Sequence, residues 1–439
     1  DGTIGNITGD FTGNFAKSET SDASGGAIYN EGTMTLINSS FYDNYVQTGA
    51  EKDSTNGQKT LGGAIYSISD LTIKADGGES IFRGNKVKWA NGEDSSAIYL
   101  AGTSGNKLNL DARNGGLIEF DDKISAAKLS TIVITGDKTG NITFNNVLEN
   151  FAPLDVQQAN VNIKEGAGTV VNTTVHDDGT LNILENATAE DSVVNDKGTL
   201  HVASGGLAEN TTINSGGTLI AENEAKVNNM LANDGANLDI DAGSLLSGDI
   251  VIHAGATMGG SYDYSKIFKD EVADAGSLTL IGGLNDALSE SSLINTTEGK
   301  KLHLTDGSYV IGDGAYAVNG WDLLTLQNNA NVKLEGDITL NGPNKKLIIK
   351  NGSELNLAGN SPTNYTITGS VSNDGSMTFT HAGDDADDIT TIYGNYTAYN
   401  NAQMTIDVNP TDNTSDLLRI DGDVAGTTNV VLNIVGADV

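Results

Sequence analysis

The most regular feature of the chain is a 19-residue pattern of hydrophobic and polar positions. Blocks of this length begin at Leu181, Leu200, Leu219 and Leu238. A second apolar position keeps the same interval, at Val175, Val194 and Ile213. Alternation over three to five residues is typical of a strand with one buried face, and the intervening DDGT, DKGT and SGGT segments are typical of turns. The pattern therefore predicts short strands joined by tight turns.

Strands this short cannot bury a face alone, but strands stacked in register cover one another about 4.8 Å apart. Such an interval suits a coil of two or three strands that packs only on its neighbours. Helices of ten or more residues are disfavoured because glycine-threonine pairs and β-branched residues recur too often. We therefore predict an all-β fold, a parallel β-helix (β-solenoid) with three-sided coils in the form of an elongated rod.

The N-terminal part of the chain, residues 1–150, carries a second repeat with different motifs. GGAIY occurs at residues 25–29 and 62–66, and SSAIY occurs at residues 95–99. Segments of the form F-x-x-N alternate with these, at residues 11–14, 41–44 and 82–85. A further alternating run lies between the two motifs, so that one coil would contain three strands. The intervals between GGAIY motifs are longer than that of the first repeat because loops are inserted, notably at residues 47–60.

Stacking these motifs in register predicts columns of like side chains. Interior isoleucines would be Ile28, Ile65 and Ile98. An aromatic column would contain Phe11, Phe41 and Phe82. An asparagine ladder at a turn, with amides bonded to one another, would contain Asn14, Asn44 and Asn85. The residue after each isoleucine would point outward, which gives a ladder of Tyr29, Tyr66 and Tyr99.

These motifs resemble those of one family of bacterial surface proteins. GGAI with F-x-x-N resembles the passenger repeats of chlamydial polymorphic membrane proteins and related autotransporters. ASGGLAENTTINSGGTLI, at residues 203–220, resembles the repeat of self-associating and diffuse-adherence autotransporter adhesins. Residues 394–437 are similar to the pertactin-like end of many passengers. The resemblance implies the passenger domain of a type V, classical monomeric autotransporter, folded as a right-handed parallel β-helix.

Motifs and resemblance together divide the chain into four expected segments. Residues 1–150 would form GGAI and F-x-x-N coils, and residues 151–260 would form the 19-residue coils. Residues 261–359 would form further coils, with a loop or helical excursion near 261–276. Residues 360–439 would form the C-terminal autochaperone-like cap. The resemblance also implies that the family's outer-membrane β-barrel follows the last residue and is absent from this sequence.

Composition changes the picture by excluding some partners. The formal net charge is −34, and such an acidic chain is not expected to bind nucleic acid through phosphate contacts. Cysteine is absent, so stability must come from packing and hydrogen bonds. No apolar run approaches the length that indicates a membrane-spanning helix.

No catalytic motif stands out, so we assign no catalytic residue and expect a protein that is not an enzyme. The five histidines are scattered, and H-E-x-x-H, G-x-S-x-G and P-loop motifs are all absent. Because some β-helix proteins are polysaccharide lyases or hydrolases, a polysaccharide-active enzyme is kept as the second alternative.

One acidic segment, HAGDDADD, is a weak candidate for a metal site. Its clustered carboxylates are Asp384, Asp385, Asp387 and Asp388. Such clusters can bind calcium, yet the EF-hand and G-G-x-G-x-D loop patterns are both absent. A solvated acidic loop is the favoured interpretation, so we expect no cofactor, with calcium as the alternative.

Two aromatic groups are candidate binding surfaces. The tyrosine ladder would suit a sugar ring or a partner surface, although outward aromatics more often pack locally. The excursion at residues 261–276 contributes Tyr262, Tyr264 and Phe268. Loops on a rigid scaffold often carry binding, whereas a bend or a cap of the core is an equally good interpretation.

The expected function is that of a cell-surface adhesin on a Gram-negative bacterium, anchored at the outer membrane or released outside the cell. Rod-to-rod contacts with the same protein on neighbouring cells would mediate self-association, aggregation, biofilm formation or attachment, and so contribute to virulence. The alternative partner is a protein or glycan on a host surface. Within the full-length protein, the passenger's own C-terminal outer-membrane β-barrel would be a further partner.

Overall fold

The computed structural model describes residues 6–52, 59–103, 105–261, 276–283, 300–311, 318–357, 364–380 and 386–436. The chain forms two compact units. Unit 1 comprises residues 1–227 and 239–244, and unit 2 comprises residues 228–238 and 245–439. The four segment boundaries expected from the sequence stay predictions.

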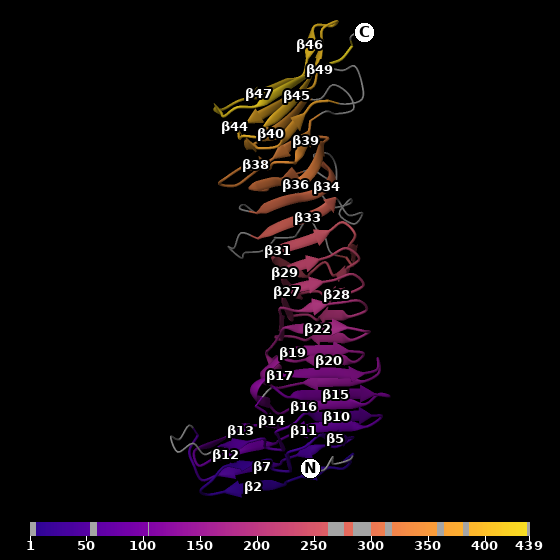
Figure 1. The fold of residues 1–439 in the computed structure, drawn as a ribbon, viewed down its shortest axis with the longest axis vertical. Coiled ribbons are helices and arrows are strands. Elements are labelled where there is room, and N and C mark those ends of the chain that lie inside the picture. The colour runs from indigo at the N-terminus through magenta and orange to yellow at the C-terminus, as the bar shows by residue number, and fades with distance from the viewer. Residues whose placement is uncertain are drawn as a thin grey trace. The chain divides into compact units, whose positions relative to one another are not determined.

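Unit 1 is a stack of three-sided coils whose corresponding strands pair in parallel (Figure 1). The first face contains β4 (Ile28–Asn30), β9 (Ile65–Ser67) and β14 (Ile98–Leu100). The second contains β5 (Met34–Ile37), β10 (Leu71–Asp76) and β15 (Lys107–Arg113). The third contains β1 (Phe11–Thr12), β6 (Phe41–Tyr42), β11 (Glu79–Arg83) and β16 (Leu117–Phe120). The predicted parallel β-helix with three-sided coils is therefore confirmed.

The coils of unit 1 become shorter along the chain while the pairing register is kept. On the first face Ile28 pairs with Ile65, Ile65 with Ile98, and Ile98 with Ile124, so each interval is shorter than the one before. The strands that continue the stack are β17 (Ile124–Gly136), β18 (Asn141–Phe144), β19 (Leu148–Gln157) and β20 (Asn160–Ile163). The intervals fall because fewer residues leave the coil between its strands.

The 19-residue repeat forms the most compact coils. One such coil contains β24 (Thr188–Glu190), β25 (Val193–Val194) and β26 (Thr199–Val202). On the third face β26 lies between β23 (Thr180–Ile183) and β28 (Thr218–Ala221). Leu200 pairs there with Leu181 on one side and Leu219 on the other, and all three side chains are fully buried. The leucines thus return at a constant interval because each lies directly above the previous one in the core.

The phenylalanine column runs through the interior of unit 1. Adjacent rings stack with their centroids 4.7 to 5.5 Å apart. Besides the three predicted residues, the column contains Phe120 and Phe144, which the sequence analysis did not include. Ile65 and Ile98 are also fully buried, as expected for inward residues of the first face.

The asparagine ladder lies at a turn of unit 1 and ends in a carboxylate. The side-chain amide of Asn14 donates to Asn44 Oδ1 at 2.9 Å, and that of Asn44 donates to Asn85 Oδ1 at 2.9 Å. Asn85 Nδ2 then donates to Asp122 Oδ2 at 2.7 Å. Each side-chain amide therefore donates a hydrogen bond to the next residue of the ladder, and these bonds link consecutive coils.

A lateral sheet leaves the coils of unit 1 before they return to the first face. It contains β2 (Phe15–Ser18), β7 (Tyr45–Thr48) and β12 (Lys86–Trp89) in parallel. β13 (Gly92–Ser95) follows β12 as an antiparallel hairpin partner. β3 (Ala23–Ser24) and β8 (Thr60–Leu61) form a short pair beside it. The chain re-enters the coil through the Gly-Gly-Ala motifs, where space is very limited.

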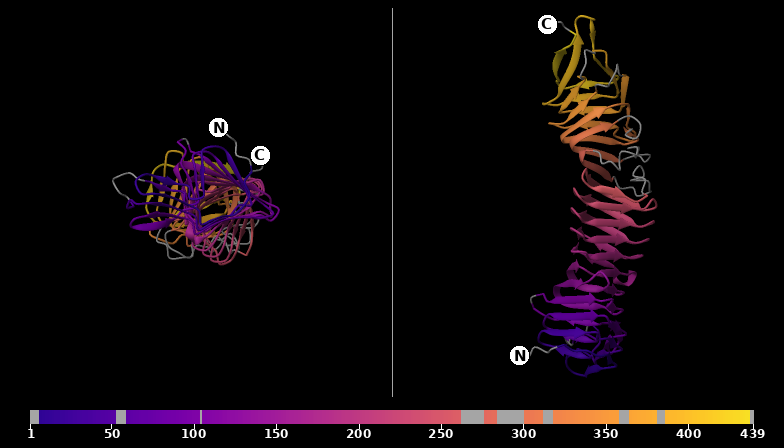
Figure 2. Two further views of the ribbon diagram at one scale, coloured as in Figure 1. Left: turned by 90° about the horizontal axis from the view of Figure 1, so that it is seen from below. Right: turned by 90° about the vertical axis from the view of Figure 1, so that its right-hand side faces the viewer.

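Unit 2 repeats the three-sided plan (Figure 2). One face contains β33 (Ser277–Gly283), β34 (Lys301–Ile311), β36 (Leu323–Leu334), β38 (Lys346–Ile349), β41 (Ser370–Asn373) and β44 (Tyr396–Ala398). The next contains β39 (Glu354–Asn356), β42 (Ser376–Thr378), β45 (Gln403–Asn409) and β49 (Asn429–Ile434). The third contains β35 (Val318–Asn319), β37 (Ile338–Thr339), β40 (Asn364–Thr368), β43 (Ile389–Tyr393) and β47 (Leu417–Ile420).

Within the described ranges, helical structure is limited to one 3₁₀ turn at Glu165–Ala167. The same residues contain no helix with the length and hydrophobicity needed to cross a membrane.

Candidate functional site

The tyrosine ladder lies on the outside of the first face of unit 1. β4, β9 and β14 pair in register, so Tyr29, Tyr66 and Tyr99 lie directly above one another. Adjacent rings stack, with centroids 5.0 Å and 5.9 Å apart and interplanar angles of 16° and 11°. Tyr29 is 55% exposed, whereas Tyr66 and Tyr99 are half-buried. Burial raises the pKa of the Tyr66 and Tyr99 hydroxyls above their usual value, so both stay protonated and able to donate at neutral pH.

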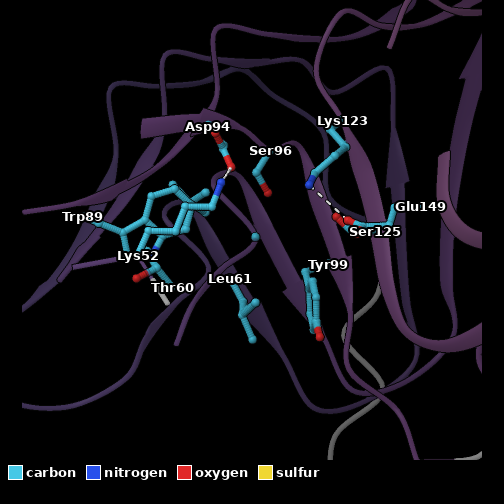
Figure 3. Close-up of a pocket in the computed structure, with 12 residues that line it drawn as sticks. Lys52, Thr60, Leu61, Trp89, Asp94, Ser96, Tyr99, Lys123, Ser125 and Glu149 are labelled. Atoms are coloured by element: carbon cyan, nitrogen blue, oxygen red, sulfur yellow. Dashed lines mark hydrogen bonds and ion pairs between the residues drawn. The ribbon is translucent and has the colours of Figure 1, made fainter. Parts of the chain in front are cut away.

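The ladder stops at Tyr99 because the next coils supply small and charged residues in its place. Ser125 of β17 pairs with Tyr99, and Glu149 of β19 pairs with Ser125. A fourth stacked ring would occupy the space above Ser125. That space is part of a cavity of about 260 Å³, which Tyr99, Ser125 and Glu149 help to line (Figure 3).

The other side of the cavity comes from the lateral sheet. Trp89 lies at the end of β12, and Asp94 lies across the hairpin on β13. Lys52 Nζ lies 5.0 Å above the Trp89 ring and 2.5 Å from Asp94 Oδ2. A cation above an indole ring is held by the ring's quadrupole, so Lys52 is fixed by two neighbours.

A second ion pair closes the opposite side. Lys123 Nζ lies 3.0 Å from Glu149 Oε2, and Figure 3 shows this pair across the cavity from Lys52 and Asp94. The two pairs together carry no net charge. Because all four side chains are at least 30% exposed, each pair contributes little to stability, and its polar atoms are accessible from the cavity.

Two buried serines, Ser96 and Ser125, also line the cavity. Ser96 Oγ accepts the backbone N–H of Gly63 at 3.3 Å, which leaves its own hydrogen available to donate. Ser125 is also buried, at 5% exposure, and lies on the same wall as Tyr99. The cavity therefore combines an aromatic wall, hydroxyl groups and charged groups of both signs, which suits a polar ring better than an apolar one.

Several candidate residues from the sequence are not brought to this site. Tyr262, Tyr264 and Phe268 lie outside the described residues, as do Asp384 and Asp385. Of the remaining acidic candidates, Asp387 is exposed and Asp388 is buried in unit 2. Over the described ranges, no group of three or more histidine, aspartate or glutamate side chains is arranged to hold a metal ion. Calcium binding by the acidic segment stays a prediction.

Asp388 belongs to a buried acidic group that sequence reasoning missed. Asp416 accepts the backbone N–H of Asp388 at 3.0 Å and that of Asp407 at 2.8 Å. All three residues are at most 4% exposed. Burial, together with repulsion from Asp407 and Asp388, raises the pKa of Asp416 to about 6. These carboxyl groups connect strands of unit 2 rather than lining a cavity in the described structure.

Sequence reasoning also missed the second half of the cavity in unit 1. Trp89, Asp94 and Lys52 lie outside the repeated motifs, so no column of like residues pointed to them. The Asn-Gly pair at residues 91 and 92 is a strong hairpin signal. That signal would have placed Asp94 near Trp89.

Comparisons with known proteins leave the family unassigned. No family model matches the chain, and no curated protein matches it. Among solved structures, the chain is similar to one described as the crystal structure of a TibC-catalysed, hyper-glycosylated fragment of TibA, residues 55–350. The match covers 97% of this chain and 100% of that chain, with 10% identity and a TM-score of 0.26. Similarity at this level indicates nothing about function.

Proposed function

We propose that the chain is an adhesin passenger of an autotransporter, displayed on or released from the surface of a Gram-negative bacterium. The observation that carries the proposal is the in-register stack of polar residues on the outer faces of unit 1. Thr180, Thr199 and Thr218 lie directly above one another, one per coil. The repeat motifs that resemble adhesin passengers form these same coils. A surface that repeats its hydrogen-bonding groups at every coil is suited to multivalent contact rather than to one reaction.

Homotypic pairing is the adhesive mode that these faces favour. Two stacks laid side by side would each present threonine, asparagine and serine groups at the same strand spacing. Each hydrogen bond contributes only about 1 kcal/mol net, but many bonds in register add together. The net charge of −34 opposes pairing, so added salt or divalent cations would strengthen it. Cell aggregation, biofilm formation and a contribution to virulence follow from such pairing.

Sedimentation velocity over a concentration series tests this mode directly. We expect concentration-dependent dimers whose dissociation constant falls as the salt concentration rises, with a further decrease in calcium. Magnesium at the same ionic strength is the control for a specific calcium effect. A monomer under every condition, or weaker pairing at higher salt, would contradict homotypic adhesion.

Attachment to a host surface is the second candidate, favoured by the stacked tyrosine ladder. Its outer end, Tyr29, is exposed and faces solvent. Replacement of Tyr29, Tyr66 and Tyr99 by serine would remove cell binding if the ladder is the contact, whereas unchanged binding would exclude it. An enzyme acting on polysaccharides is the third candidate. Release of reducing sugar from polyuronates would establish that activity, and we expect no such release.

A further inference from the structure

We infer that the cavity at the end of the tyrosine ladder is a binding site for one neutral pyranose ring, such as the terminal sugar of a glycan. The inference deepens the second candidate function, and it rests on the adhesin proposal only for its biological role. Its starting point is the interruption of the ladder at Tyr99. Three rings stack, and the next coil places a serine where a fourth ring would continue the series.

The space above Ser125 has the dimensions of a single sugar. The cavity of about 260 Å³ is slightly smaller than the pockets that hold drug-sized ligands. A ring that continued the ladder would lie one stacking step from Tyr99, and the existing steps are 5.0 Å and 5.9 Å between centroids. A pyranose offers one face of C–H groups, which would pack on the Tyr99 ring as a fourth member of the stack.

The polar groups around the position suit hydroxyl groups. Lys52 and Lys123 donate hydrogen bonds, and Asp94 and Glu149 accept them. Ser96, with one accepted bond from Gly63, still has its hydroxyl hydrogen to donate. A sugar hydroxyl both donates and accepts, so it can bridge the two members of an ion pair without leaving either charge unpaired.

The charge balance favours a neutral sugar over a charged one. Two lysines face two carboxylates, so the cavity itself has no excess charge. An anionic sugar would have to displace Asp94 or Glu149 from its lysine and would approach a chain of net charge −34. A purely aromatic ligand would bury the serines and ion pairs without giving them partners, which costs binding free energy.

Saturation-transfer-difference NMR on the whole chain tests the inference with free sugars as probes. We expect galactose, mannose, glucose or N-acetylglucosamine to receive saturation on the protons of one ring face, with weak affinity in the millimolar range. Glucuronate is the anionic probe and p-cresol is the aromatic probe. Binding of p-cresol but no neutral sugar would overturn the inference, and so would preferential binding of glucuronate.

Two substitutions and one matched control localise the signal. Ser125→Tyr would supply the fourth ring of the ladder and fill the cavity, so sugar binding should disappear. Tyr99→Ala should weaken binding about 2- to 12-fold, because the stacking platform is lost. Tyr393→Ala, at a strand tyrosine of unit 2 that is 52% exposed and does not line the cavity, should leave binding unchanged. Circular dichroism of each variant reports whether the fold is kept.

The outcomes separate this inference from the adhesin proposal. Sugar affinity that is unchanged in both Ser125→Tyr and Tyr99→Ala folded variants would exclude this cavity. If Ser125→Tyr does not fold, the Tyr99→Ala result alone decides. Loss of sugar binding with intact self-association would show that homotypic pairing does not use the cavity. A chain that binds sugar yet sediments only as a monomer would leave this inference standing while removing homotypic adhesion.

Discussion

At the scale of the residue, the neighbours above and below decide which side chain fits. Asp122 illustrates this at the end of the asparagine ladder. Its carboxylate accepts from both nitrogens of Asn85, from the backbone N–H of Gly84 and from the hydroxyl of Ser95. Every neighbour is a donor, so an acceptor-only carboxylate satisfies the site better than another amide would. Burial raises the pKa of Asp122, and the hydrogen bonds oppose that rise.

Asp416 in unit 2 gives a pH-dependent prediction at this scale. Burial, with repulsion from Asp407 and Asp388, raises its pKa to about 6 from an ordinary value of 3.8. The folded state therefore favours the protonated form, and the stability that this residue contributes is present below the ordinary pKa. That stability is lost as the pH rises through about 6. We expect the free energy of unfolding of the wild type, relative to an Asp416→Asn variant, to fall between pH 4 and pH 7.

Urea denaturation at a series of pH values measures that difference. An Asp412→Asn variant is the control, because Asp412 lies nearby but is exposed. A stability difference between wild type and Asp416→Asn that does not change with pH would contradict the prediction.

At the scale of the element, the coil is shaped by where glycine lets backbones approach. In the Gly-Gly-Ala motif the first glycine, Gly62, has a φ of 66°. A Cβ on the second, Gly63, would lie 2.3 Å from the carbonyl oxygen of Ser96 and 2.6 Å from the backbone nitrogen of Lys86. Both contacts are with backbone, so neither can yield without moving a neighbouring coil.

Replacement of Gly63 by alanine should therefore destabilise the protein strongly. We expect a loss of about 3 kcal/mol in the free energy of unfolding, at the upper end for overpacking. Gly115→Ala is the control for an uncrowded glycine, since Gly115, unlike Gly63, has a positive φ of 76° and nothing within 4 Å of the added carbon. It should lose only about 1–2 kcal/mol, the cost of a left-handed backbone. Equal losses in urea denaturation would show that crowding is not the cause.

The columns of like side chains could be predicted from the sequence because their motifs repeat. The cavity could not be predicted, because its lining residues lie where the repeat is interrupted. The phenylalanine, asparagine and tyrosine ladders follow from identical residues at matching positions of successive motifs. Phe120 and Phe144 were missed because their coils no longer carry the F-x-x-N motif. Ser125 gave no signal, because a serine where a tyrosine is expected is informative only once the register is known. Trp89 and Lys52 lie in segments that leave the coil, and their approach depends on tertiary structure.

At the scale of the whole molecule, charge is distributed unevenly along the chain. Residues 1–150 contain 12 of the 24 lysine and arginine residues but only 19 of the 58 acidic residues. The rest of the chain therefore carries most of the negative charge. Like charges repel most in a compact state, so the folded chain is destabilised relative to a neutral one of the same fold.

Screening should therefore stabilise the protein. We expect the midpoint of thermal unfolding to rise as sodium chloride increases from about 0.02 M to about 0.5 M, because the Debye length shortens over this range. The exposed ion pairs also weaken with salt, but each contributes little. The control repeats the series near the isoelectric point of about 4.2, where the net charge is close to zero and the effect should disappear. A midpoint that falls with salt at neutral pH would contradict this prediction.

The 19-residue coil also determines which insertions and deletions in the gene the fold can accommodate. Because Thr180, Thr199 and Thr218 occupy the same place in successive coils, loss of one whole coil would leave every remaining strand with an equivalent neighbour. A deletion one residue shorter or longer would instead turn inward side chains outward in every strand that follows the break within that coil. In-frame changes that add or remove the codons of a whole coil are therefore the ones that this part of the chain can absorb. Natural and engineered variants of this part of the chain should therefore differ in length by a whole number of coils.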